Sequence, residues 1–223
     1  MSDLHLYDKL LQFPLFLGMS EEDLEQIVAH TKLDFHKAKE GDIIAKNNDI
    51  CQHLFFLTNG KIEIFTTAVN HSYSFTEYRM TPEVFEMESI FGFSQYYSHT
   101  YKASSNCSFI AIDKEEVRRL YNTFPLFRLN FTNLITTLLQ RANTIAWRTA
   151  PVDLRQLIIK FFRIHCLYPA GEKLVRIKMT NLAQELNDRQ WNISKELNQL
   201  KDEGLIELGR TSIHIPAFEK LLM

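Results

Sequence analysis

The feature that most constrains the fold of this chain is a change of hydrophobic period along it, from helical to β and back to helical. Between about residues 33 and 112, short alternating or apolar runs rich in Phe, Ile, Thr and Tyr are separated by turn signals at Asn47-Asn48-Asp49, Asn59-Gly60 and Asn70-His71. This spacing is typical of a small antiparallel barrel or sandwich. The segments on either side have apolar residues at helical spacing, so the chain is predicted to be an α+β protein.

The helical segments carry start and stop signals. Ser20 precedes the stretch EEDLEQIVAH, and it is predicted to cap a helix whose first acidic residues compensate the helix dipole. After the strands, Leu126 to Ile145 forms a long segment with a broad apolar stripe, which can bury itself against the chain's own barrel or against a second copy. Pro151 is predicted to begin a further helix that ends at Pro169-Ala170-Gly171. A domain boundary is therefore expected near residues 148 to 151.

Composition narrows the environment of the protein and argues against several kinds of site. The chain has 223 residues, enough for one large domain or two modest ones. No apolar run approaches the roughly 18 residues that span a bilayer, and the N-terminus lacks the basic-then-apolar order of a secretion signal. We therefore expect a cytoplasmic protein without membrane contact.

The three cysteines have no spacing suited to zinc or an iron-sulfur cluster, so no metal site is expected.

The distribution of charge gives a weak basic signal. The formal net charge is −2, so attraction to nucleic acid must come from local segregation of charge. Between Arg141 and Arg163, five basic residues occur with only one acid, Asp153. From Glu172 to the end, however, eight Lys or Arg residues balance eight Asp or Glu residues.

The stretch LAQELNDRQWNISKELNQL, residues 182 to 200, contains two short helical patterns. Thr180 is a suitable N-cap for the first helix, Asn187 can take the left-handed conformation of a tight turn, and Gly204 ends the second helix. The following LIELGRTSIHI is predicted to form two short strands that turn at Gly209-Arg210. This order of elements is that of a winged helix-turn-helix. The residues expected to face its core are Leu182, Ala183, Leu186, Ile193, Leu197 and Leu200.

The polar residues of this segment suit DNA recognition. Arg can bridge two acceptors of guanine, Gln or Asn can pair with adenine, and Lys, Ser or Thr bind phosphates. In the alternative interpretation, these side chains only keep an exposed helix face soluble. Trp191 either contacts a thymine methyl group or a sugar, or is a partly buried anchor between helix and wing. The candidate readers are Arg189, Gln190, Trp191 and Asn192, and the candidate phosphate contacts are Thr180, Ser194 and Lys195.

Several stretches resemble, in order and spacing, landmarks of the CRP/FNR superfamily of bacterial transcription regulators, from about residue 8 to the end. In the first half they are FPLFLGMSEEDLEQI, KAKEGDIIAKNND, LFFLTNGKIEIF and CSFIAIDKEEVRRL, and in the second half MTNLAQELNDRQWNISKELNQLKDEGLIEL. The resemblance implies an antiparallel, jelly-roll-like β-roll effector domain with flanking helices in residues 1–124. It also implies a long dimerisation helix in residues 125–148 and a winged helix-turn-helix in residues 149–223. The implied partners are a second copy, a two-fold site on double-stranded DNA, RNA polymerase and a small-molecule effector.

The chain departs from this family where members that bind cyclic nucleotides hold the ligand. Glu88 stands at the position of the family's Glu, but Met87 replaces the preceding Gly, and Tyr97-Ser98 replaces an Arg-Ser or Arg-Thr pair. Without the guanidinium the cyclic phosphate loses a charge-assisted partner, so we do not expect cyclic AMP to bind. His99 and Lys102 either replace the missing charge or face solvent. The effector pocket implied by the resemblance comprises Met87, Glu88, Ser89, Tyr97, Ser98, His99 and Asn143.

The reading helix also departs from the family. Gln190-Trp191 and Lys195 stand where the family commonly has Arg-Glu and a second Arg, so the usual half-site is not expected. The leading hypothesis is a homodimeric DNA-binding regulator whose β-roll senses an unidentified small molecule or has lost ligand binding. The alternative is a ligand-binding signalling module whose C-terminal domain contacts protein. No Gly-rich phosphate loop, GxSxG elbow or HExxH pair occurs, so no enzymatic activity is expected.

Overall fold

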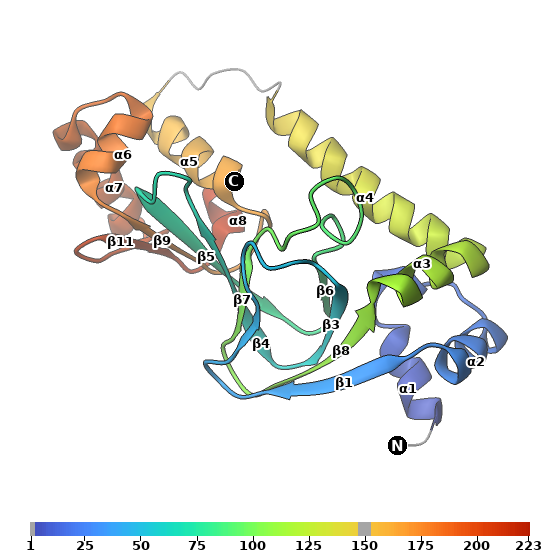
Figure 1. Ribbon diagram of the computed structural model, residues 1–223. Coiled ribbons are helices and arrows are strands. Elements are labelled where there is room, and N and C mark those ends of the chain that lie inside the picture. The colour runs from blue at the N-terminus through green and yellow to red at the C-terminus, as the bar shows by residue number, and fades with distance from the viewer. Residues whose placement is uncertain (1–2, 147–152) are drawn as a thin grey trace. The chain divides into compact units, whose positions relative to one another are not determined.

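The computed structural model describes residues 3–146 and 153–223, which form two compact units (Figure 1). The first unit contains the described residues up to Ile62 together with Met80–Ala146, and the second contains Glu63–Arg79 together with residues 153–223. The domain limits expected from the sequence stay a prediction. The segment Glu63–Arg79 groups by its contacts with the second unit.

The first unit begins with helices and continues as a β-roll. Ser20 caps α2 as predicted, since its Oγ accepts a hydrogen bond from the amide of Asp23 at 3.1 Å. One antiparallel sheet has the strand order β1-β8-β3-β6, and β2 pairs with β7 in antiparallel fashion. The helical elements before the roll are α1 (Asp3–Leu10), the 3-10 turn η1 (Pro14–Phe16) and α2 (Glu21–His30). The strands are β1 (Leu33–Ala38), β2 (Ile43–Ala45), β3 (His53–Asn59), β6 (Glu83–Phe85), β7 (Thr100–Ala103) and β8 (Cys107–Asp113).

The three predicted turn signals each lie between consecutive strands. Asn48 has a positive φ of 68° between β2 and β3, Gly60 one of 102° between β3 and β4 (Lys61–Thr67), and His71 one of 56° between β4 and β5 (Tyr73–Met80). At Gly60 a side chain is also excluded sterically, because a Cβ atom there would lie 2.7 Å from the carbonyl oxygen of Asn106. The predicted α+β class is confirmed.

Two helices complete the first unit. Asp113 caps α3 (Lys114–Thr123) by accepting a hydrogen bond from the amide of Glu115 at 2.8 Å. The long helix α4 (Pro125–Ala146) follows (Figure 1). Its first turns are buried at Phe127 and Phe131, whereas further along Leu139 is 59% exposed. Only part of the apolar stripe of α4 is therefore covered within the single chain.

The second unit joins the β4–β5 hairpin to the C-terminal segment. Strand β5 pairs with β9 (Lys173–Ile177), which pairs with β11 (Ser212–Ile215), and β11 pairs with β10 (Glu207–Leu208), all antiparallel. The helices are α5 (Leu154–His165), α6 (Met179–Leu186), α7 (Gln190–Asp202) and α8 (Phe218–Leu221). Pro151, the predicted start of α5, lies outside the described residues. Within them, α5 begins after Asp153, whose carboxylate accepts a hydrogen bond from the amide of Gln156 at 2.7 Å.

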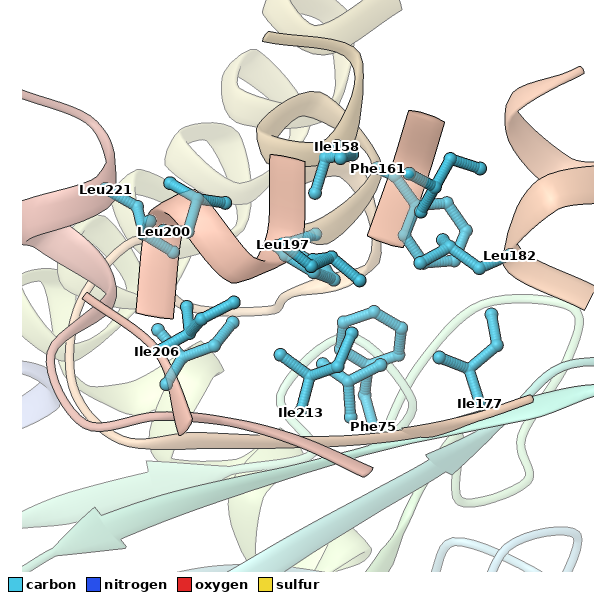
Figure 2. Close-up of a cluster of buried hydrophobic side chains, with 14 of the residues drawn as sticks. Phe75, Ile158, Phe161, Ile177, Leu182, Leu197, Leu200, Ile206, Ile213 and Leu221 are labelled. Atoms are coloured by element: carbon cyan, nitrogen blue, oxygen red, sulfur yellow. The ribbon is translucent and has the colours of Figure 1, made fainter. Parts of the chain in front are cut away.

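The core of the second unit lies between this sheet and its helices (Figure 2). Phe75 from the hairpin and Ile213 from β11 point towards Leu197 of α7 and Phe161 of α5 in this view. All four side chains are nearly inaccessible to solvent. The hairpin therefore supplies part of the hydrophobic core on which α6 and α7 rest.

A buried ion pair also ties the hairpin to the C-terminal segment. The Nζ of Lys173 in β9 lies 2.6 Å from Oε2 of Glu77 in β5, and both side chains are almost completely buried. Glu77 also accepts hydrogen bonds from the amides of Leu167 and Tyr168, and Lys173 donates to the carbonyl of Ala170. Because each buried charge has several partners, removing either one leaves an uncompensated charge and costs about 3 to 5 kcal/mol.

Candidate nucleic-acid interface and effector site

The turn between α6 and α7 is formed by the residues predicted for it. Asn187 is in the left-handed conformation, with φ 50° and ψ 45°. The carboxylate of Asp188 then accepts hydrogen bonds from the amide of Arg189 at 2.6 Å and from the side-chain amide of Asn192 at 2.7 Å. The predicted N-cap at Thr180 is wrong, because α6 begins earlier, at Met179, and Thr180 lies in its first turn as an exposed residue.

Helix α7 separates a buried face from an exposed one. Five of the six predicted core residues are buried, and Leu186 is half-buried against the same cluster. On the other face Trp191 is 73% exposed, which contradicts the alternative of a buried anchor. The ammonium group of Lys195 lies 5.9 Å from the centre of the Trp191 ring. The predicted contact residues Arg189, Gln190 and Lys195 are also exposed, whereas Asn192 and Ser194 are half-buried.

The β10–β11 hairpin follows α7 as predicted for a wing, and a histidine anchors it. His214 Nδ1 lies 3.1 Å from Glu207 of β10, and its Nε2 lies 3.1 Å from Glu172. Partial burial opposes a charge on His214, but the hydrogen bonds to Glu207 and Glu172 outweigh it and raise the pKa of the imidazole. We refer to α6, α7 and this hairpin together as the reading head.

One of the basic residues between Arg141 and Arg163 is used for an ion pair within the second unit. Arg155, one of the basic residues that suggested segregated charge, makes a double hydrogen bond with Glu203 at the end of α7, with N–O distances of 2.6 and 2.5 Å. This contact holds α5 against α7. Arg155 therefore acts within the fold, while Arg189 and Lys195 remain exposed at the beginning of α7.

In the β-roll, the segment after β6 is organised by a carboxylate that the sequence reading did not select. Glu86 is 1% exposed and has a positive φ of 67°. Its carboxylate accepts hydrogen bonds from the amides of Ser98 at 3.1 Å and His99 at 3.3 Å. Burial raises the pKa of the Glu86 carboxyl, and hydrogen bonds from Ser89, Ser98 and His99 act against that rise. The backbone amides of Ser98 and His99 are therefore already occupied by the Glu86 carboxyl group.

The predicted effector residues have different surroundings. Ser89 and Ser98 lie together, with 2.9 Å between their hydroxyl oxygens. Met87 is buried, whereas Glu88 is exposed, and Asn143 is exposed on α4. No sequence signal distinguished Glu86 from Glu88, because the choice depends on which carboxylate the backbone turns inwards.

Tyr97 and His99 point into the roll and do not replace a guanidinium. The ring of Tyr97 packs against Phe55, with 6.1 Å between their centres, and burial raises the pKa of its hydroxyl to about 12. Burial lowers the pKa of His99 to about 4, so its imidazole is neutral at pH 7. The interpretation of His99 as a solvent-facing residue is wrong, because its side chain is buried.

Among residues 3–146 and 153–223, no group of three or more His, Cys, Asp or Glu side chains is placed to hold a metal ion. Over the same described ranges, no helix combines the length and apolar character needed to cross a membrane.

Comparisons with known proteins agree with this architecture. Residues 35–124 match the family described as a cyclic nucleotide-binding domain. A sequence comparison with curated proteins found no match. The β-roll, the long helix and the reading head together have the fold of the CRP/FNR transcription regulators.

Three solved structures illustrate the likeness. The catabolite activator protein of Thermus thermophilus is 20% identical with a TM-score of 0.51, and the alignment covers 94% of this chain and 96% of that one. A protein assigned to the crp/fnr family from Eubacterium rectale is 18% identical with a TM-score of 0.53, covering 95% and 97%. The sensor domain of the transcriptional regulator DNR from Pseudomonas aeruginosa is 18% identical with a TM-score of 0.52, covering 68% and 98%. At these identities the likeness is one of fold.

Proposed function

We propose that this protein is a homodimeric DNA-binding transcription regulator that binds a two-fold site on double-stranded DNA. The observation that carries the proposal is the reading head itself. Its second helix is held by a buried core at Ile193, Leu197 and Leu200, and its first turn presents Arg189, Gln190 and Trp191 to solvent. Residues at the start of such a helix meet base edges in the major groove, and Lys195 lies one turn later, where phosphates run.

The effector part of the proposal is a β-roll that does not take a cyclic phosphate. An entering phosphate would have to displace the Glu86 carboxyl group from the amides of Ser98 and His99, and a buried polar group that loses its hydrogen bonds is costly. Tyr97 supplies no positive charge. The roll therefore responds to a different small molecule or has lost ligand binding.

The dimer is proposed to form along α4. Leu139 is largely exposed, and Leu134, Ile135 and Leu138 are half-buried in the single chain. These residues recur at spacings of three and four, which places them on one side of the helix. Pairing with α4 of a second copy buries this stripe and gives the two reading heads the two-fold relation that a palindromic DNA site requires.

A second candidate function is a signalling module whose C-terminal unit contacts protein. The observation in its favour is the equal number of acidic and basic residues from Glu172 onwards. DNA binding driven by phosphate contacts weakens steeply as salt rises, and a protein contact with a balanced surface does not show this steep dependence.

Selection of bound sequences from a random pool of double-stranded DNA tests the proposal. We expect a two-fold consensus to emerge, mobility-shift affinity for it to fall with rising salt, and added cyclic AMP to change neither result. The control is the variant Arg189→Ala, which should lose preference at one position of each half-site. Failure to enrich any sequence, with and without cell extract, would favour the signalling module. RNA polymerase is the proposed further partner once a bound site is known.

A further inference from the structure

Trp191 is a large, mainly apolar side chain in the first turn of α7, the helix proposed to enter DNA. Helix α7 begins at Gln190, so Trp191 is its second residue. Trp191 is 73% exposed, whereas Ile193 and Leu197 on the other side of the helix are completely buried. The indole therefore lies outside the core of the second unit and is available to a partner.

The side chains around Trp191 restrict which group can approach it. The side-chain amide of Asn192 already donates to the Asp188 carboxylate at 2.7 Å. Lys195 follows Trp191 by one turn, on the same side of the helix, and its ammonium group lies 5.9 Å from the centre of the indole. A phosphate bound by Lys195 would leave the indole nearer to the start of the helix, where base edges are contacted.

The chemistry of an indole limits what it can recognise on DNA. It donates one hydrogen bond and accepts none, so it cannot form the two-bond pairs by which Arg binds guanine and Gln binds adenine. Its apolar surface requires an apolar partner. Among the base edges of the major groove, the apolar group is the C5-methyl of thymine. The position of Trp191 at the start of α7 favours this methyl group over a sugar of the strand backbone.

We propose that Trp191 is a specificity-determining residue that recognises the C5-methyl group of a thymine in each half-site. This inference rests on the proposed function, because it requires α7 to enter the major groove. It deepens that function by assigning one position of the DNA site to an apolar contact instead of a hydrogen-bonding pattern. Uracil differs from thymine only by this methyl group and is therefore the matched probe.

Mobility shifts with the full chain test the proposal on the site selected from random DNA. Each thymine of one half-site is replaced in turn by uracil. Burial of a methyl group contributes enough for about a fourfold change in affinity. We expect uracil at one thymine to weaken binding about fourfold and uracil at the other thymines to change it little. Trp191→Ala should weaken binding to the thymine site and should bind the thymine and uracil sites equally.

Two further variants serve as controls. Trp191→Phe keeps an apolar ring and should still prefer thymine to uracil. Lys201→Ala, at the far end of α7, should show the same preference as the wild type, and circular dichroism verifies that all variants are folded.

The possible failures of this test are distinguishable. A selected site at which no uracil replacement weakens binding would overturn the inference and leave the regulator function standing. The same uracil effect in the wild type and in folded Trp191→Ala would also overturn it, because the methyl group would then contact another residue. Failure to select any DNA sequence would refute the proposed function, and the inference would fall with it.

Discussion

His99 illustrates at the scale of a single residue how surroundings decide chemistry. Burial lowers the pKa of its imidazole from 6.5 to about 4, because desolvation opposes the charged form. In the window between about pH 4 and pH 6.5, the unfolded chain binds more protons at His99 than the folded chain does. We therefore expect its contribution to the free energy of unfolding, up to about 3 kcal/mol, to be present above the window and lost as the pH falls through it.

Urea unfolding of the wild type and of His99→Gln, at pH values above, within and below the window, measures this contribution. The variant should lose less stability than the wild type on acidification, and identical pH profiles would contradict the assignment.

At the scale of an element, the position of each residue along α7 predicts its effect on DNA binding. Arg189→Ala or Gln190→Ala should cost about 1 to 3 kcal/mol and relax the choice at one base pair, whereas Lys195→Ala should weaken all sequences alike and lower the salt slope by about one. Lys201→Ala, at the far end of the same helix, is the charge-matched control and should change sequence preference little. Mobility shifts on the selected site and on single-base variants measure both quantities. Unchanged affinity and preference after alanine at Arg189, Gln190 and Asn192 would identify this face as a solvated surface. The side-chain amide of Asn192 donates a hydrogen bond to Asp188, and this bond must break before Asn192 can contact a base.

At the scale of the whole molecule, the exposed stripe of α4 predicts a dimer in the absence of ligand. Leu138→Glu should raise the dimer dissociation constant by about tenfold or more, because an unpaired charge is costly to bury in an apolar interface. Gln140→Glu introduces the same charge on an exposed position away from the stripe and should leave the dimer intact. Light scattering at micromolar concentration distinguishes the two results. A monomeric wild type would refute dimerisation through α4.

Much of the element order was predictable because it depends on signals a few residues long. The Ser20 cap, the left-handed turn at Asn187 and the turn at Gly60 each act through a neighbouring backbone conformation that one residue type favours. The cap at Thr180 was misplaced because helix ends shift easily by one or two residues. The exposed face of α7 followed from its helical period, since a buried stripe leaves the opposite face in solvent.

The α+β class, the change from helical to β and back to helical segments, and the two faces of α7 could therefore be predicted from the sequence, whereas strand β9 (Lys173–Ile177) was not predicted. The structure was needed to show that the β4–β5 hairpin joins the second unit through Phe75 and through the ion pair between Glu77 and Lys173. It also decided that Glu86, and not Glu88, is the buried carboxylate beside Ser98. Periodicity and capping are local, whereas burial and ion pairing depend on which distant residues the folded chain brings into contact.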